Sequence, residues 1–481
     1  MKVKHGFWKS ALIGLCAAFV GISAGCSGTT GGTASSEVGS TSSETAQTYA
    51  PFSNDEVVNL EGYEFTIGSP FIKNDVTGMN LTAQELIFEQ ARRKTEELLN
   101  CKINIINMVA DMPTLQSRIM SGDKVADLLD ISPYSLYSAI NAGYIRPMEE
   151  IEGIDYNDPR WVAGYTTLAT YKGRHYGLNF IRPPEARYVL FFNKDLIRSS
   201  GVTEDLYQLV RDGEWTFDKF REICIATTKD TDSNGEPDTY GLHVSDPVAA
   251  GLALINANNG KMVDVVDGQA VEAFTSSQVI TGLNFYNQLV NEDKTVHVYD
   301  YMRSEDTLND TVSIQDLANY FLRGKAAFWL CESWVGNQYI RPSSAGIEYG
   351  MLPLPKGPDA SDYVSPAYNA RVFSFTTTNK DLDKAVLVFN TLAKFVYGDD
   401  ETWWHEDVAN DYFQADDTDS LEMYLLCLEK SSLDLGYVTG VDQVFGTNAI
   451  AKGIYLRQST PAAQAEALKG TLTETINGIL N

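Results

Sequence analysis

The chain has few basic residues for its length. Its 37 Lys and Arg stand against 64 Asp and Glu, which gives a formal net charge of −27 at pH 7. A surface this acidic disfavours nucleic acid and polybasic contact with membranes, and it argues against an anionic substrate unless a local basic patch overrules the total. The charge balance also suits the plain solubility of an exposed protein.

Residues that commonly carry catalysis or bind metal are also scarce. There are only five histidines, and no nucleophile elbow, HExxH, P-loop or paired His/Cys metal spacing occurs. The four cysteines beyond residue 26 lack CxxC spacing and lie in apolar runs, so buried free thiols are favoured over the three disulfide pairings that four cysteines allow. They are Cys101, Cys224, Cys331 and Cys427. These absences favour a binding protein over an enzyme.

The N-terminus has the pattern of a targeting segment. Three lysines within the first nine residues precede an apolar stretch, residues 11–22, which is too short to span a bilayer. The stretch ends Ser23-Ala24-Gly25-Cys26, which resembles the lipobox of bacterial lipoproteins. That resemblance implies a signal peptide over residues 1–25 and a diacylglycerol thioether on Cys26. Ordinary cleavage beside an accidental cysteine is the alternative.

A polar tether follows. Residues 27–49 are almost all Ser, Thr, Gly, Ala and Glu, which cannot bury enough apolar surface to order the chain. We therefore expect a disordered segment over residues 26–51. Two acyl chains at its start would hold the folded body stably at a membrane.

The body is predicted to be an α/β protein of two or more domains, because 481 residues exceed what one core supports. Its first part alternates strands and helices at the spacing of right-handed βαβ units. The expected elements are strands 64–68, 102–108 and 126–131 and helices 83–99 and 115–120. Ligands bind beyond the carboxyl ends of such strands, which places Ser69, Asp130 and Tyr134 near a cleft. Surface packing is the other interpretation of Tyr134.

A crossover between two lobes is expected at residues 171–196. Pro183-Pro184 is stiff and offers no amide hydrogen, and the apolar run 188–192 after it reads as a buried strand. Glu185, Arg187 and Tyr188 would then lie on the seam between the lobes.

Residues 230–241 follow the pattern of a calcium loop. Oxygen side chains stand at relative positions one, three, five and nine, with a glycine at six and the Glu236 carbonyl facing the ion. The ligands would be Asp230, Asp232, Asn234, Glu236 and Asp238. Position twelve is Gly241 instead of a bidentate Glu, so a further carboxylate is needed or the site is weak. A polar turn without an ion is the alternative.

Residues 324–334 run from a glycine turn into a buried strand, at whose end Glu332 and Trp334 emerge into a loop. An indole face can stack on the apolar C–H surface of a sugar while a carboxylate accepts hydroxyl hydrogen bonds. We therefore expect this pair to bind ligand, with core packing as the other interpretation of Trp334.

Five segments in order resemble the extracellular solute-binding proteins (family 1) of ABC transporters, the sugar- and maltose-binding group. They are KGRHYGL (172–178), FNKDL (192–196), WTFD (215–218), FLRGKAAF (321–328) and YGMLPLPKGP (349–358). The resemblance covers roughly residues 60–481. It implies a periplasmic-binding-protein-like fold: two α/β lobes, joined by crossing strands, that close on ligand.

The resemblance also implies a domain division and a set of cleft residues. Lobe 1 would hold residues 52–187 and 367–430, and lobe 2 residues 188–366 and 431–481. Tyr134, Glu185, Tyr188 and Trp334 would line the cleft, and a return crossing at 365–371 would turn Asn369 and Arg371 to the ligand. Arg371 could instead form a structural ion pair. Glu185 stands one residue out of the family's register, so its carboxylate could face ligand, Arg187 or neither.

The expected function is capture of a small solute, a sugar or oligosaccharide, by lobe closure and its delivery to an ABC transporter permease. The protein would be a monomer on the extracellular face of the cell membrane, held by its lipid anchor alone, with no nucleic acid and no cofactor for chemistry. Two alternatives stay open. One is a cell-surface carbohydrate hydrolase using Glu185 and Glu332 as its two carboxylates. The other is a ligand sensor for a membrane kinase.

Overall fold

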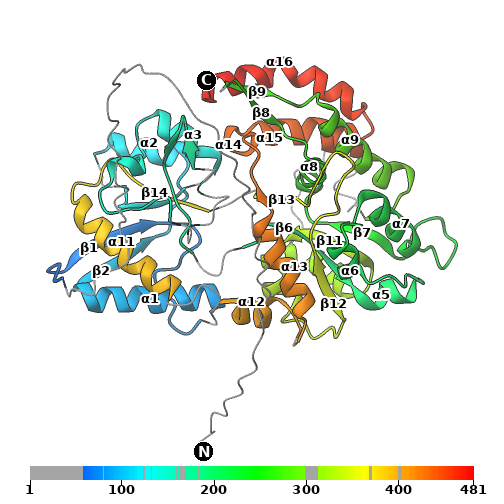
Figure 1. Cartoon of the computed structure of the whole chain (residues 1–481), viewed down its shortest axis with the longest axis horizontal. Coiled ribbons are helices and arrows are strands. Elements are labelled where there is room, and N and C mark those ends of the chain that lie inside the picture. The colour runs from blue at the N-terminus through cyan, green and yellow to red at the C-terminus, as the bar shows by residue number, and fades with distance from the viewer. Residues whose placement is uncertain are drawn as a thin grey trace, which may run out of the picture. The chain divides into compact units, whose positions relative to one another are not determined.

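The computed structural model describes residues 58–79, 81–122, 125–131, 133–158, 161, 166, 169–181, 185–267, 269–297, 313–367, 371–398, 404–414 and 416–480 (Figure 1). The predicted signal peptide, Cys26 and the tether lie outside these residues. So do Pro183, Pro184, Asn369 and the side chain of Tyr134.

The first lobe is built on a four-stranded sheet in the order β14-β3-β1-β2. β1 pairs in parallel with β2 and β3, and β14 returns antiparallel to β3. The strands are β1 (Tyr63–Gly68), β2 (Cys101–Ile106), β3 (Leu128–Ile131) and β14 (Val372–Phe375). The helices of this lobe are α1 (Ala83–Leu99), α2 (Met112–Met120), α3 (Pro133–Asn141) and α11 (Leu382–Tyr397), with the 3-10 turn η1 (Met148–Glu150) and the hairpin β4 (Thr170–Tyr171) and β5 (Arg174–His175). The predicted α/β class is confirmed.

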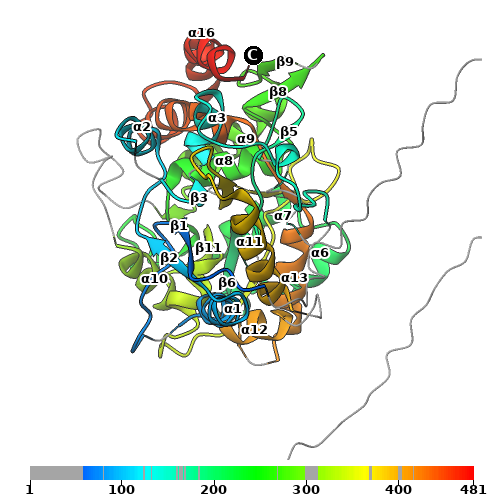
Figure 2. The same cartoon turned by 90° about the vertical axis from the view of Figure 1, so that its left-hand side faces the viewer.

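Local sequence signals account for the start of α1. Thr82 accepts a hydrogen bond from the Glu85 amide, and the Glu85 side chain accepts one from the Thr82 amide, and together these two bonds form a capping box. The buried face of α1 carries Phe88, Ala91 and Leu99 and packs against α11 (Figure 2). α1 also contacts β2, and α11 contacts β1, so the helix pair lies on this sheet.

The second lobe is built on a five-stranded sheet in the order β10-β7-β11-β6-β12. β6 pairs antiparallel with both β11 and β12, whereas β7 pairs in parallel with β10 and β11. The strands are β6 (Tyr188–Asn193), β7 (Tyr240–Val244), β10 (Val296–His297), β11 (Ala326–Glu332) and β12 (Tyr349–Leu352). All six residues of β6 are buried, as its unbroken apolar sequence predicts.

Several helices of the second lobe contact this sheet, and others pack elsewhere in the lobe. The helices of this lobe are α5 (Lys194–Ser199), α6 (Leu206–Arg211), α7 (Phe217–Thr227), α8 (Pro247–Ala257), α9 (Ser277–Asn287), α10 (Ile314–Leu322), α12 (Trp404–Tyr412), α13 (Thr418–Glu429), α14 (Gly436–Thr439), α15 (Val441–Phe445) and α16 (Pro461–Leu480). The remaining elements are the π-helices η2 (Gln288–Glu292), η5 (Gly336–Ile340) and η6 (Gly446–Tyr455) and the short strands β8 (Val263–Val266), β9 (Gln269–Glu272), β13 (Ser365–Pro366) and β15 (Ser431–Ser432).

The cores differ in one respect from the predicted domain division. Residues 367–430 were expected in lobe 1, but α12 and α13 pack into the core of the second sheet, for example through Tyr412 and Tyr424. α11, which precedes them, packs into the first core. α13 packs on β12, the edge strand of the second sheet. Its buried Ser420 accepts a hydrogen bond from the Met351 amide, which ties the helix to that strand.

The last helix joins the second core, as expected, and also contacts the first lobe. Ala465, Leu472 and Ile476 are buried with the second core. At its end the Ile479 carbonyl accepts a hydrogen bond from the Tyr171 hydroxyl at 2.8 Å. α16 therefore has partners in both lobes.

Candidate functional site

The crossover into the second lobe carries a paired acid. The Arg187 Nη1 atom donates to Glu185 Oε2 at 2.6 Å, and both side chains are largely buried. Of the two partners considered for Glu185, ligand and Arg187, the structure shows Arg187. Burial raises the pKa of the neighbouring Tyr412 hydroxyl well above its usual value, and Tyr424 and the Glu185 charge raise it further. The acid is thus set into a packed region.

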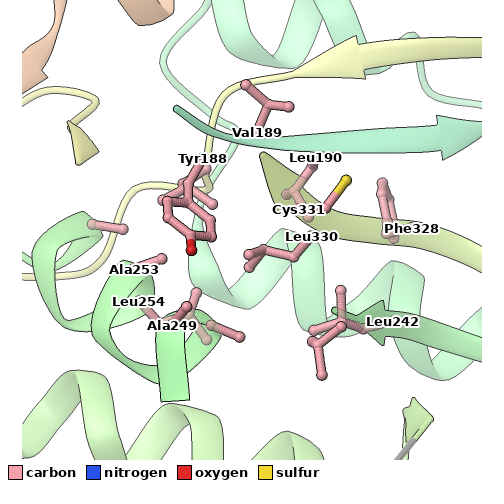
Figure 3. Close-up of a cluster of buried hydrophobic side chains, with 14 of the residues drawn as sticks. Tyr188, Val189, Leu190, Leu242, Ala249, Ala253, Leu254, Phe328, Leu330 and Cys331 are labelled. Carbon is pink, nitrogen blue, oxygen red and sulfur yellow. The ribbon is translucent and has the colours of Figure 1, made fainter. Parts of the chain in front are cut away.

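Tyr188 starts β6 and belongs to the core. It is 7% exposed, and its ring lies beside Ala249 and Ala253 of α8 (Figure 3). Its place in the ladder is directly opposite Glu332. Tyr188 therefore supports the end of β11 by packing.

The end of β11 gathers polar atoms that lack partners. We call Glu332, Ser333, Trp334 and Asn337 the Glu332 cluster. Trp334 Nε1 donates to Glu332 Oε2 at 2.5 Å, which fixes the carboxylate. Glu332 Oε1, Ser333 Oγ and Asn337 Oδ1 are buried without a hydrogen-bond partner. Each such atom costs free energy unless something donates to it, so this cluster is suited to a ligand with several donors.

Packing holds the cluster in place. The Ser333 amide donates to the Arg187 carbonyl at 3.0 Å and extends the β11–β6 ladder by one residue. η5 begins at Gly336, where a β-carbon would stand 2.6 Å from the Phe191 ring, so only glycine fits against β6. Trp334 is half-buried and meets Tyr339 edge-on, with ring centroids 6.1 Å apart.

In the first lobe, Arg371 forms an ion pair. Its Nη2 and Nε atoms lie 2.5 and 3.0 Å from Asp130 Oδ2, which also accepts from Ser69 Oγ at 2.7 Å. We call Ser69, Asp130 and Arg371 the Arg371 network. Sequence reasoning left a ligand contact and an ion pair open for Arg371, and the structure shows the ion pair. The network joins the ends of β1 and β3 to the start of β14.

Phe71 is the residue that sequence reasoning missed. It is 63% exposed, and the Arg371 guanidinium carbon lies 5.2 Å from its ring centroid. Phe71 and Arg371 line a small hollow with Lys73, Gln84 and Glu85. Its signal was its position two residues after Ser69, beyond the carboxyl end of β1, where ligands of parallel sheets bind.

The acidic loop adopts a compact turn. Carboxylate oxygens of Asp230, Asp232 and Asp238 lie within 4.8 Å of one another. Asp230 accepts from the amides of Asn234 and Gly235, at 3.2 and 2.9 Å, and Gly235 has a φ of 93° that favours glycine. Hydrogen bonds from Thr231 lower the pKa of Asp238. The loop is thus folded around its acids, as a calcium loop would be.

The arginines at the two crossings are paired with acids. Arg371 faces Asp130, and Arg187 faces Glu185. Among the described residues, Glu332 makes no ion pair. The cluster it leads therefore offers a carboxylate and neutral acceptors, which suits hydroxyl or ammonium donors. The Glu185 carboxylate of the hydrolase alternative is engaged by Arg187.

Two α/β lobes with a sheet each, exchanged strands and polar clusters at the crossings define the class of binding proteins with two lobes. The profile of the bacterial extracellular solute-binding proteins matches residues 83–400, more than half of the chain. The chain belongs to this family, and the predicted resemblance is confirmed.

Solved structures with the same fold hold different ligands. An ABC substrate-binding protein from Listeria monocytogenes in complex with cycloalternan is 14% identical, with a TM-score of 0.58 over 87% of this chain and 100% of the other. The Bdellovibrio bacteriovorus maltose/maltodextrin-binding domain bound to maltotriose is 17% identical, with a TM-score of 0.56 over 86% of this chain and 100% of the other. UgpB from Mycobacterium tuberculosis in complex with glycerophosphocholine is 14% identical, with a TM-score of 0.61 over 87% of this chain and 98% of the other. At these identities the likeness shows the fold alone.

Comparison with curated proteins returns no match. In the part of the chain that the structure describes, no helix is both long and apolar enough to cross a membrane.

Proposed function

We propose that this solute-binding protein captures a sugar or oligosaccharide. The observation that carries the proposal is the Glu332 cluster, which presents three buried acceptors without partners beside a half-buried indole. A sugar supplies hydroxyl donors for the acceptors and C–H faces for Trp334. The saccharides bound by the Listeria and Bdellovibrio proteins support the same class.

The capture mechanism we propose is closure of the two lobes. Ligand favours the closed form because only there do both lobes touch it. Phe71 and the Arg371 network would supply the first lobe's contacts, and the Glu332 cluster those of the second. Tyr134 and Asn369 remain proposed ligand contacts on the family resemblance.

A thermal-shift screen tests the proposed ligand class. Maltotriose, cycloalternan and monosaccharides should raise the Tm of the purified protein if they bind, with glycerophosphocholine, peptides and polyamines as controls. If the cationic controls raise the Tm and the saccharides do not, the ligand is a cation instead of a sugar. The Glu332 carboxylate can also accept hydrogen bonds from an ammonium group. Release of monosaccharide from an oligosaccharide by the purified protein would establish the hydrolase alternative instead.

We propose that Cys26 carries the lipid anchor and that the loaded protein delivers its solute to an ABC transporter permease. The lipobox-like sequence before Cys26 and the polar tether after it support anchoring. Retention of wild-type protein in the membrane fraction, and loss of Cys26→Ser protein to the medium, is the expected result. Equal distribution of the two would contradict the anchor. A sensor kinase partner would show itself as a signalling defect without a transport defect.

We also propose a structural Ca²⁺ at the loop of residues 230–238. The three clustered carboxylates and the Glu236 carbonyl position support it. Added Ca²⁺ should raise the Tm above that in chelator, and an ion hundredfold above its Kd would contribute about 2.7 kcal/mol.

The matched variant for calcium is Asp232→Asn, which removes one charge from the exposed loop and should remove the shift. Glu214→Gln, an exposed acid elsewhere in the second lobe, should retain it. Equal Tm values with Ca²⁺ and chelator in wild-type protein would show that the loop is a plain turn.

A further inference from the structure

A second hollow lies in the second lobe, beside the acidic loop. Its volume is about 320 Å³, and its lining includes Gly235, Glu236, Tyr240, Asn291, Lys294 and Arg457. We call it the Arg457 hollow. None of its lining residues belongs to the Glu332 cluster or the Arg371 network, which are proposed to hold the solute.

The backbone around the hollow is under strain. Lys294 has a φ of 55° and Arg457 a φ of 52°, in the left-handed region that residues with long side chains rarely adopt. Two π-helices meet here as well: η2 ends two residues before Lys294, and η6 ends two residues before Arg457. Strained residues and π-helical turns are concentrated at functional sites.

The two bases keep their charge. Arg457 Nε donates to Asn291 Oδ1 at 2.7 Å, and the Asn291 amide nitrogen donates to the Ile454 carbonyl at 3.0 Å. A neutral amide thus orients the guanidinium without neutralising it. Within the described ranges neither Arg457 nor Lys294 forms an ion pair, although the chain has far more acids than bases.

The nearest acids do not cancel this charge. Asp293, adjacent to Lys294, is taken by Arg221, whose Nε and Nη2 atoms lie 2.6 and 2.7 Å from its oxygens. Glu236 contributes one negative charge to the lining against the two positive charges of Lys294 and Arg457. Lys294 and Arg457 are therefore two bases that no carboxylate pairs with among the described residues, although the acidic loop of residues 230–238 borders the hollow.

We propose that the Arg457 hollow binds a small anion with a carboxylate or phosphate group. A guanidinium held through Nε presents its two Nη groups, which match two oxygens of such a group, and a lysine adds a point charge. The strained backbone is retained because it aims both bases into one hollow. This site is independent of the proposed solute site.

Calorimetric titration tests the site, with inorganic phosphate and succinate as probes at constant ionic strength in calcium-free buffer. Wild-type protein should bind at least one probe saturably. Arg457→Gln and Lys294→Gln should each weaken binding by about tenfold or more, because each removes a charge-assisted contact. Lys261→Gln, the same change at an exposed lysine of this lobe, should have no effect. Absence of saturable binding of both probes, or equal binding in all variants, would overturn the proposal.

Glycine variants separate the site from folding. Lys294→Gly and Arg457→Gly relieve the left-handed strain, so each should unfold at a higher temperature than wild type without the anion. Neither should gain the Tm increase that the bound probe gives wild-type protein. A glycine variant that keeps the full probe-induced increase would also overturn the site.

Discussion

Arg371→Met is expected to lower the free energy of unfolding by about 3 kcal/mol or more, because it leaves a buried carboxylate without its cation. The Asp130 side chain is only 2% exposed, and its Oδ2 atom accepts from both Nε and Nη2 of Arg371. After the substitution only the Ser69 hydroxyl would remain as a partner. Urea unfolding of the two proteins measures the difference.

The controls distinguish a buried pair from a surface pair. Arg198→Met breaks exposed contacts to Asp195 and Glu348, and such solvent-screened pairs contribute little to stability. Adding Asp130→Asn to Arg371→Met should recover part of the loss, because the unpaired charge is gone. If Arg371→Met is no more harmful than Arg198→Met, Asp130 is solvated and the Arg371 network does not hold the strands together.

Local and periodic signals made much of the fold predictable. The Thr82–Glu85 capping box, the Thr216 cap of α7 and the βαβ spacing each depend on residues close in sequence, and the structure shows all three. The helix predicted over residues 83–99 has these bounds in the structure, whereas α2 begins at Met112, three residues before the predicted start. Residues 404–430 were predicted to belong to lobe 1, but they pack into the core of the second lobe. No local sequence signal distinguishes a helix that packs beside α11 from one that packs on β12.

The candidate site was less predictable because it depends on partner choice. β6 is buried along its whole length, so its sequence has no alternation to show that Tyr188 packs on α8. Glu185 and Arg187 are two residues apart, and only the crossover geometry decides that they pair with each other. The position of Phe71 beyond the carboxyl end of β1 was visible in the sequence, but the exposure of its ring beside Arg371 depends on the fold. Glu332 and Trp334 were found because a strand ending in an acid and an indole is visible in sequence.

The two arginines of the crossings differ from the two bases of the Arg457 hollow in the partners of their charged groups. Arg187 and Arg371 each face a carboxylate, so neither arginine brings an unpaired positive charge to its crossing. Arg457 faces an amide instead. Every arginine carries the same charge in the sequence, and only its partner in the fold shows whether it forms a structural ion pair.

Glu332→Gln should stabilise the ligand-free protein and weaken ligand binding. The Oε1 atom is buried without a partner, and the carboxylate makes no ion pair with a described residue. Replacing the charge with an amide removes part of this desolvation cost, and the free energy of unfolding should rise by about 1 kcal/mol. The amide keeps one acceptor for Trp334 Nε1, so the local packing should survive.

Binding should change in the opposite direction. A carboxylate that accepts from ligand hydroxyls contributes charge-assisted bonds, so its loss should weaken maltotriose, or whichever saccharide shifts the Tm most, by about tenfold to hundredfold. Glu214→Gln is the matched control and should leave both stability and affinity unchanged. Calorimetry on the two variants gives the affinities. A Glu332→Gln protein with unaltered affinity would place the solute elsewhere, whereas lower stability without ligand would mean that Oε1 has a partner in solution. If the Glu332 carboxylate lacks a hydrogen-bond partner until ligand binds, the variant should be more stable than wild type without ligand and should bind the ligand more weakly.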